Sequence, residues 1–289
     1  MGEAILGSEA VAAGVISRGR LRWNHRIIYP DVYVPRDAEI TMAVKAHAAY
    51  LWARRRAVVT GRAAAALHGA KWVDDVEPVE LLCSNNHRPF GIVTRRERYS
   101  PDEVMIVDGI RVATPARTAF DLGRHLHRGK AVAHLDALAS ATGIGPAEVL
   151  SLANRYAGAR GTRALRTAAD LMDAGAQSPK ETWLRLLLID AGYPRPTTQI
   201  PVFDDYSEPF AYLDMGWQDV MIAVEYDGDQ HRKDRGRYVW DERRLRRLLR
   251  LGWLHVKVIA EDRPADVLAR VRYAWTLRER ESMAVKAPA

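Results

Sequence analysis

The sequence has little cysteine and no long apolar run. Its 289 residues include one cysteine, Cys83, which excludes an intramolecular disulfide framework and a zinc site built from several thiolates. No apolar stretch approaches the roughly 20 residues of a membrane-spanning helix, and the N-terminus lacks the basic and apolar regions of a secretion signal. We therefore expect a cytoplasmic protein with no membrane partner.

Acidic residues are outnumbered by basic ones. The chain has 43 Lys and Arg against 36 Asp and Glu, a formal net charge of +7 and a pI near 9.6. Such a balance favours an anionic partner, and nucleic acid before a membrane because no basic amphipathic anchor stands out. The length suggests about two domains, and a hydrophobic content of 48% is ordinary for a globular protein.

Carboxylates gather at the end of a predicted strand pair in residues 212–231. Asp214 lies on the first strand, and residues 220–226 form a second, mostly apolar strand that leads into Glu225 and Asp227. Carboxylates at the mouth of a buried strand are costly unless a positive charge sits between them. The simplest partner is a divalent cation, Mg²⁺ or Mn²⁺.

The pattern D-x10-E-x-D-G-x-x-H in this stretch resembles the metal site of the PD-(D/E)xK nuclease superfamily, and most of all its Vsr-like endonuclease branch. The resemblance covers roughly residues 177–280. It implies that Asp214 and Glu225 hold the metal with the backbone carbonyl of Tyr226, and that Asp227 or Glu181 completes the shell, directly or through water. The metal would polarise a DNA phosphate and lower the pKa of an attacking water.

One position departs from the superfamily. Asp227 stands where a lysine usually follows the acidic residue, and the resemblance implies that His231 or Lys257 takes over that catalytic role. The family's first helix carries a glutamate that faces the metal, and Glu181 matches it. Glu181 also completes a capping box with Ser178, so it has a structural alternative as well as a catalytic one. The substitution at Asp227 favours the alternative of a nuclease fold that no longer cuts.

Residues 232–250 hold nine Lys and Arg against three Asp and Glu, a net charge of 9 − 3 = +6. Phosphate backbones attract such a surface, and arginine suits bidentate phosphate contacts. The alternative is a solvated helix face in a chain with only seven lysines among its 43 basic residues. The candidate DNA-binding residues here are Arg232, Lys233, Arg235, Arg243 and Arg247. With a helix from Ser178, a strand after Gly252 and a closing helix, we predict a restriction-endonuclease-like α-β-β-α-β-α core.

The first 36 residues predict a winged helix-turn-helix module. A short helix at residues 10–13, a basic second helix after Val15 and a two-stranded wing at residues 26–35 follow each other in that order. The segment resembles the N-terminal domain of the AbiEi antitoxin family. The candidate DNA-binding residues are Arg18, Arg20, Arg22 and Arg26. The alternative is a small cap that packs on the next domain and touches no DNA.

The middle of the chain predicts a mixed α+β domain with strands up to residue 113 and four helical stretches from Thr114 to Met172. The motifs V-T-G-x-x-A-A-x-x-H-G and T-P-x-R-T-x-x-D resemble the AbiEi-type domain found ahead of Vsr-like nuclease domains. Arg117 and Asp121 are four apart, as in ordinary helix support. The histidines show no convincing metal spacing and are interpreted as core or surface residues: His68, His125, His127 and His134.

The expected fold is therefore a multi-domain α/β protein. Its predicted parts are a winged-helix module (1–36), an AbiEi-like α+β domain (37–172), a linker (173–177), a Vsr-like nuclease domain (178–282) and a tail (283–289).

The main functional hypothesis is a metal-dependent DNA endonuclease acting on double-stranded DNA, as a monomer or homodimer, in repair or phage defence. The alternative is a non-catalytic DNA-binding regulator or antitoxin-like protein with a degenerate nuclease fold. RNA is a further possible substrate, through stacking of bases on Trp217 or Tyr226.

Overall fold

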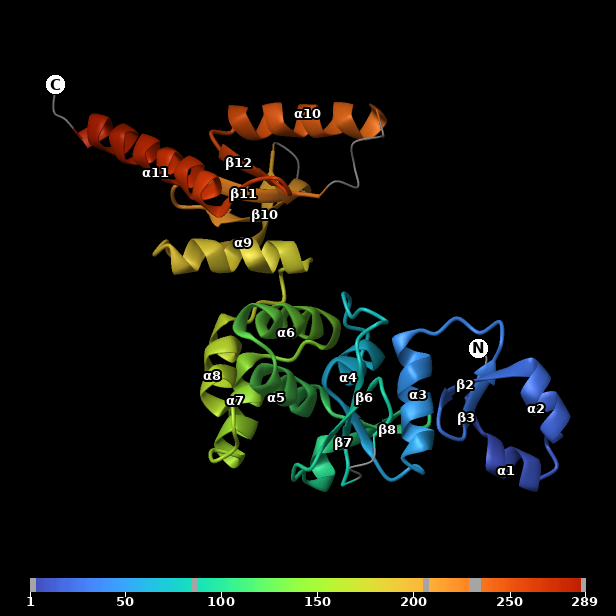
Figure 1. The fold of residues 1–289 in the computed structure, drawn as a ribbon. Helices are drawn as coiled ribbons and strands as arrows, with labels where there is room; N and C mark the ends of the chain where they lie inside the picture. Colours follow the sequence, from blue (N-terminus) through green and yellow to red (C-terminus); the bar gives the residue numbers. More distant parts are fainter. Residues whose placement is uncertain (1–3, 85–87, 205–207, 229–234, 287–289) are drawn as a thin grey trace. The chain divides into compact units, whose positions relative to one another are not determined.

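The computed structural model describes residues 4–84, 88–204, 208–228 and 235–286, with the backbone alone for 235–239 and 284–286 (Figure 1). The chain forms two compact units, Met1–Ala174 and Gly175–Ala289, which divide inside the predicted linker. In the described part of the chain, no helix has the length and apolarity needed to cross a membrane.

The first unit begins with two short helices and a β-hairpin, in the predicted order. The elements are β1 (Ile5–Leu6), α1 (Gly7–Ala12), α2 (Arg18–Asn24), β2 (His25–Tyr29) and β3 (Val32–Pro35). The strands form an antiparallel sheet of order β1-β3-β2. Ser17 caps α2 by accepting a hydrogen bond from the Arg20 N–H at 3.3 Å, so the second helix begins where the polar cap residue ends the turn.

Residues 1–36 do not form a separate compact unit, although the sequence predicts a boundary after residue 36. Helix α3 (Met42–Trp52) shares one hydrophobic core with this segment, in which Leu6 and Val32 pack with Ala46. Three short strands bury too little apolar surface to be stable alone. The N-terminal segment is therefore built onto the middle of the chain.

Ion pairs reinforce this attachment. Just after α3, Arg54 contacts Asp31 at 2.9 Å and Arg55 contacts Glu9 at 2.7 Å. Both pairs are largely exposed and contribute little stability each, but they neutralise the two described acidic residues of the segment. The positive charge of α2 is thereby left unbalanced locally.

The middle of the first unit is a five-stranded mixed sheet of order β6-β5-β4-β8-β7. Its elements are β4 (Val58–Thr60), α4 (Gly61–Leu67), β5 (Val79–Leu82), β6 (Ile92–Arg95), η1 (Pro101–Glu103), β7 (Val104–Val107) and β8 (Ile110–Ala113). The pairs β4–β8 and β5–β6 are parallel, and the others are antiparallel. The predicted strand runs are confirmed.

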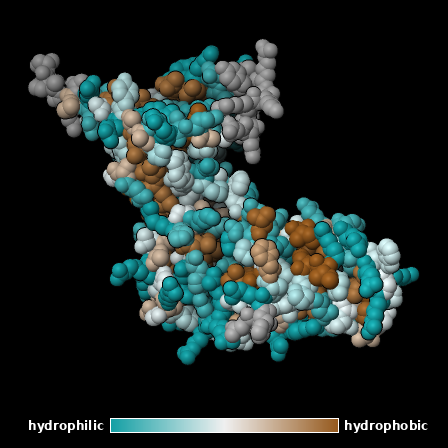
Figure 2. Space-filling view, in the orientation of Figure 1, coloured by the Kyte–Doolittle hydropathy of each residue, from teal (hydrophilic) through white to brown (hydrophobic). Residues whose placement is uncertain are grey.

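Four helices complete the first unit: α5 (Pro115–His125), α6 (Arg128–Thr142), α7 (Pro146–Arg155) and α8 (Thr162–Leu171). They confirm the four predicted helical stretches. On the face shown in Figure 2, apolar residues gather over α3, and much of the remaining surface of this unit is hydrophilic.

The two sequence motifs of this unit meet in space. The Thr60 hydroxyl of the first motif donates a hydrogen bond to Asp121 of the second at 2.6 Å. Gly61 has φ +60°, and a Cβ there would collide with the carboxylate of Glu80. Only glycine suits both the left-handed backbone and the close approach. The Val-Thr-Gly sequence is therefore dictated by packing.

The second unit is a four-stranded sheet between helices. Its elements are α9 (Pro179–Asp190), β9 (Thr197–Phe203), β10 (Pro209–Trp217), β11 (Ile222–Asp227), α10 (Arg235–Arg250), β12 (Leu254–Ile259) and α11 (Pro264–Lys286). The sheet order is β12-β11-β10-β9, with β11 and β12 parallel and the rest antiparallel. Helices α9 and α11 pack on one face of the sheet and α10 on the other (Figure 1).

The predicted α-β-β-α-β-α order lacks one strand that the structure contains. Strand β9 precedes β10, so three antiparallel strands come before α10. Pro201 lies inside β9, and proline argues against a central strand because it has no N–H to donate. At the edge of the sheet, where β9 lies, proline is tolerated.

Candidate functional site

The predicted carboxylates lie side by side where β10 and β11 meet. Met215 pairs with Val224 in the antiparallel register, which places Asp214 opposite Glu225. The Tyr226 N–H donates a hydrogen bond to Asp214 Oδ2 at 2.9 Å. The tight turn between the strands brings together two residues that are 225 − 214 = 11 positions apart.

Glu225 is buried and its carboxylate is held by the side chains of Arg244 and His255. Arg244, from α10, donates from Nη1 at 2.9 Å and from Nη2 at 2.5 Å, one to each carboxylate oxygen. His255 Nε2, from β12, contacts the oxygen that Arg244 Nη1 also reaches. Arg244 further donates to the Tyr212 carbonyl at 2.9 Å. Both oxygens of Glu225 are therefore engaged within the protein.

The two carboxyls are held in opposite electrostatic states. Burial raises the pKa of Glu225, but the hydrogen bonds and charges of His255 and Arg244 outweigh it and lower the pKa to about 2. Burial, followed by the charges of Glu225 and Glu181, raises the pKa of Asp214 to about 7. At neutral pH the site thus holds a fully ionised Glu225 beside an Asp214 close to its midpoint.

Glu181 serves as a helix cap beside this pair. Its Oε1 accepts from the Ser178 hydroxyl at 2.9 Å, its Oε2 accepts from the Gln177 N–H at 2.9 Å, and its own N–H donates to Ser178 Oγ at 3.2 Å. The structural role predicted for Glu181 is present. Burial and the charge of Glu225 raise the pKa of Glu181, so its carboxyl also senses the site.

Asp227 pairs with Lys257 across the parallel strands β11 and β12. Lys257 Nζ lies 2.5 Å from Asp227 Oδ2, and both side chains are at least one-third exposed. Lys257 thus neutralises Asp227 and makes no ion pair with Glu225. Of the other predicted residues, His231, Arg232 and Lys233 lie outside the described residues, as does the side chain of Arg235.

The residues present do not fit Mg²⁺ or Mn²⁺ as they are arranged. Carboxylate oxygens are the ligands such cations prefer, but those of Glu225 are taken by Arg244 and His255, and Asp227 is taken by Lys257. Within the described ranges, three potential ligand atoms of different residues come within 4.8 Å of one another at a different place. The positive charge expected from a metal is supplied here by side chains.

That other place is Glu97, Asp121 and His125 in the first unit. Arg124 lies 2.8 Å from Glu97, and the fully buried Arg117 lies 3.0 Å from Asp121. Burial raises the pKa of Glu97, while hydrogen bonds from His125 and Arg124 bring it down to about 2. Two guanidinium groups already balance these carboxylates. Arg117 and Asp121 thus belong to a buried ionic network, which goes beyond the ordinary helix support predicted for them.

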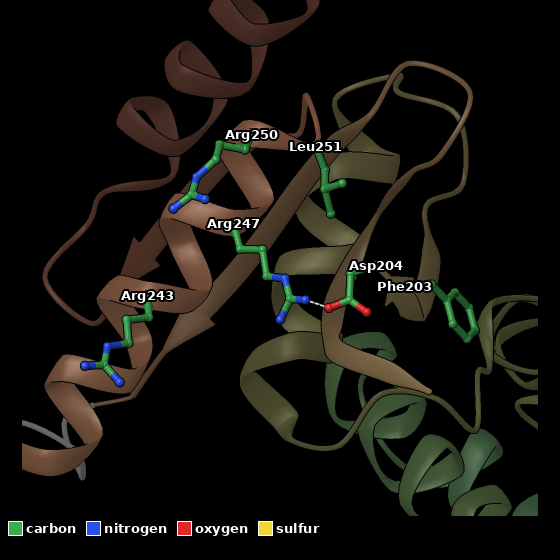
Figure 3. Close-up of a pocket in the computed structure, with 6 residues that line it drawn as sticks. All are labelled: Phe203, Asp204, Arg243, Arg247, Arg250 and Leu251. Carbon is green, nitrogen blue, oxygen red and sulfur yellow. Dashed lines mark ion pairs between the residues drawn. The ribbon is translucent and has the colours of Figure 1, made fainter. Parts of the chain in front are cut away.

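A second feature of the C-terminal unit is an arginine-lined pocket of about 620 Å³ beside α10 (Figure 3). It is lined by Phe203, Asp204, Arg243, Arg247, Arg250 and Leu251. Arg247 pairs with Asp204 and stacks over the Phe210 ring at 4.3 Å from its centroid. Arg243 and Arg250 are exposed and point away from Asp204 in Figure 3, which leaves them accessible to an anion.

The predicted DNA-binding arginines of the first unit lie on α2. Arg18, Arg20 and Arg22 are all exposed, and Trp23 beside them is 76% exposed. Arg26, on β2, donates to the Ala38 carbonyl at 2.6 Å and is partly committed to the fold. The helix therefore presents three arginines and an indole ring to solvent.

The sequence interpretation missed Arg244 and His255. Helical spacing offered a signal for the first, because Arg243, Arg247 and Arg250 share one face and Arg244 lies four residues before the buried Leu248. His255 is two residues before Lys257 on a strand and shares its face. Neither signal identifies Glu225 as the partner, because Arg244 and His255 lie 19 and 30 residues from Glu225 in the sequence.

The raised pKa of Asp214 predicts a pH-dependent stability. The folded-state pKa of about 7 exceeds the ordinary 3.8, so the folded chain binds more protons between these values and stability falls as pH rises from about 4 to 7. Asp214→Asn removes this loss. We compare the free energy of unfolding of the variant with that of the natural protein. The difference should shift in favour of the variant by on the order of 2 kcal/mol between pH 4 and pH 7. Urea denaturation across this range measures the difference, and a constant difference would contradict the assignment.

Comparisons with known proteins find similarity over part of the chain. Residues 53–174 match the family model of the AbiEi antitoxin C-terminal domain. Two uncharacterized proteins of Mycobacterium tuberculosis, from strains CDC 1551 / Oshkosh and H37Rv, are each 30% identical over 168 residues, which is 57% of this chain and 62% of the relative. The similarity thus spans less than two thirds of these curated relatives. No solved structure matches the chain.

Proposed function

We propose that this protein is an antitoxin-like DNA-binding regulator whose C-terminal unit contacts nucleic acid without cutting it. The observation that carries the proposal is the engagement of both Glu225 oxygens by Arg244 and His255. A buried carboxylate whose two oxygens already contact an arginine and a histidine has less electrostatic need for a metal ion. The charge arrangement therefore favours a binding role over a hydrolytic one.

The match of residues 53–174 to the AbiEi antitoxin C-terminal domain supports the antitoxin-like part. The DNA-binding part rests on α2, whose Arg18, Arg20 and Arg22 are exposed next to Trp23. In the helix-turn-helix mode of binding, a short basic helix lies in the major groove and its arginines contact phosphates and base edges. Helix α2 has the position and charge for this role.

The arginine pocket beside α10 supplies a second contact surface. Arg243 and Arg250 lie near the paired Arg247, and their guanidinium groups suit bidentate contacts with phosphate. In this account, α2 and the face of α10 bind separate stretches of DNA or act at different times. Neither contact requires a metal ion.

The direct test of the binding role is the metal dependence of DNA affinity. We expect the full chain to bind a labelled duplex with the same affinity in EDTA and in Mg²⁺ at matched ionic strength, and Glu225→Gln to leave that affinity within about twofold. Fluorescence anisotropy measures both. Binding that needs Mg²⁺ and is lost in Glu225→Gln would contradict the proposal, because the acidic site would then hold a metal in the complex.

A metal-dependent DNA endonuclease is the second candidate, and one observation favours it. The pKa of Asp214 is raised to about 7 by burial and by the charges of Glu225 and Glu181, which indicates surplus negative charge at the site. Mg²⁺ or Mn²⁺ would relieve it, and Glu225 could join as a ligand only if it gave up its contacts with Arg244 and His255. The two candidates differ in whether DNA is cleaved.

A further inference from the structure

A large basic pocket lies in the first unit, and no residue of α2 lines it. It measures about 980 Å³, within the range of small-molecule sites. Five arginines and one acidic residue line it: Arg54, Arg56, Arg95, Arg96, Arg98 and Glu97. A concave surface with such a charge balance concentrates anions.

The topology of the sheet creates this pocket. Strands β5 and β6 are parallel, with Leu82 paired to Arg95, so their carboxyl ends lie at the same edge. Residues at and after the ends of β5 and β6 line the pocket. Residues that follow α3, among them Arg54 and Arg56, line it as well. In sheets with parallel strands, ligands bind beyond the carboxyl ends of the strands.

Two of the arginines are balanced inside the protein. Arg95 pairs with Glu80 at 2.8 Å, and Arg54 pairs with Asp31 at 2.9 Å. The acidic residue of the pocket, Glu97, is itself balanced from behind by Arg124 at 2.8 Å. Asp31, Glu80 and Glu97 are therefore each paired with an arginine.

The other three arginines have no acidic partner within the described ranges of the chain. Arg56 and Arg98 make no ion pair there, and the Arg96 guanidinium donates only to the Ser84 carbonyl, at 3.0 and 3.2 Å. That contact fixes Arg96 and leaves its remaining N–H groups available. Three positive charges around one cavity repel each other. A ligand with several negative charges would relieve this repulsion.

Two aromatic side chains also line the pocket, Trp52 and Tyr99. Both are partly exposed, and each lies close in sequence to one of the unpaired arginines, Arg56 and Arg98. Aromatic rings stack on nucleobases, and each such contact contributes about 1–3 kcal/mol in nucleic-acid complexes. The lining thus joins arginines with two aromatic side chains that also pack partly against the hydrophobic core.

We propose that this pocket binds a nucleoside di- or triphosphate. Its phosphate chain reaches the guanidinium groups of Arg56, Arg96 and Arg98, and its base rests on Trp52 or Tyr99. Its lining residues all belong to the first unit, and none of them lies on α2. It gives the antitoxin-like part of the chain a small-molecule ligand, and the proposal holds or fails independently of DNA binding.

The test is titration calorimetry of the full chain with ATP and GTP in EDTA at low salt, beside AMP and inorganic tripolyphosphate. The variant is Arg56→Ala with Arg98→Ala. The matched control is Arg160→Ala with Arg163→Ala, two exposed arginines of the same unit outside the pocket. Circular dichroism and thermal unfolding check that both variants fold.

We expect saturable binding of ATP or GTP, at least tenfold weaker binding of AMP and of tripolyphosphate, and at least a tenfold loss in the pocket variant but not in the control. No binding of either nucleotide would overturn the proposal. So would equal affinity for tripolyphosphate, which would make the site a simple anion site. A pocket variant that loses only duplex DNA affinity would assign these arginines to the DNA-binding surface instead.

Discussion

Replacing Arg244 with alanine should lower the local stability of the C-terminal unit by about 3–5 kcal/mol, because it leaves the buried Glu225 without its main partner. The remaining partner is His255, which contacts one oxygen of Glu225. Asp214, opposite Glu225, adds further negative charge to the same place as the pH rises through about 7. Hydrogen exchange of peptides from β10 and β11 in the full chain measures the effect as faster exchange.

Arg246→Ala is the matched control. Arg246 lies on the same helix, is 70% exposed and faces Glu242 at 3.7 Å, so we expect a change within about 0.5 kcal/mol. Adding Glu225→Gln to Arg244→Ala should restore part of the lost stability by removing the unpaired charge. If Arg244→Ala behaves like Arg246→Ala, Arg244 does not neutralise Glu225 in solution.

Replacing Arg18, Arg20 and Arg22 together with alanine should weaken binding of duplex DNA by about a hundredfold at low salt. Each lost phosphate contact should also reduce the slope of log affinity against log salt by about 1, or about 3 in total. All three side chains are exposed, so the fold should be unaffected. Fluorescence anisotropy at several KCl concentrations gives both quantities.

The variant Arg160→Ala with Arg163→Ala removes two exposed arginines from the same unit and serves as the control. It should leave both the affinity and the salt slope close to those of the natural protein. If the α2 variant also binds DNA unchanged, the N-terminal segment is a cap that packs on the middle of the chain and touches no DNA.

Much of the fold follows from local patterns in the sequence. The strands and helices of residues 57–172 are marked by apolar alternation, turn residues and caps such as Thr114, and the structure contains them all. Strand β9 was missed because Pro201 argues against a strand unless its edge position is known. Nothing in the sequence indicates that Val32 and Ala46 share one core, because that contact depends on packing between segments on either side of residue 36.

The candidate site, like the fold, could be predicted from the sequence only in part. A hairpin register is set by its turn, so the neighbourhood of Asp214 and Glu225 could be predicted from spacing alone. The choice of partner for Glu225 could not, because Arg244 and His255 arrive from a helix and a strand far along the chain. The sequence therefore indicated where the carboxylates gather but not which side chains neutralise them.

The most direct test of this account is plasmid cleavage by the purified full chain in Mg²⁺, Mn²⁺ and EDTA, beside Asp214→Ala. A regulator in which Arg244 and His255 hold Glu225 should retard supercoiled plasmid in all three conditions and leave it intact, with the variant behaving in the same way. Nicking or linearisation that requires metal and disappears in Asp214→Ala would contradict the account and establish the endonuclease.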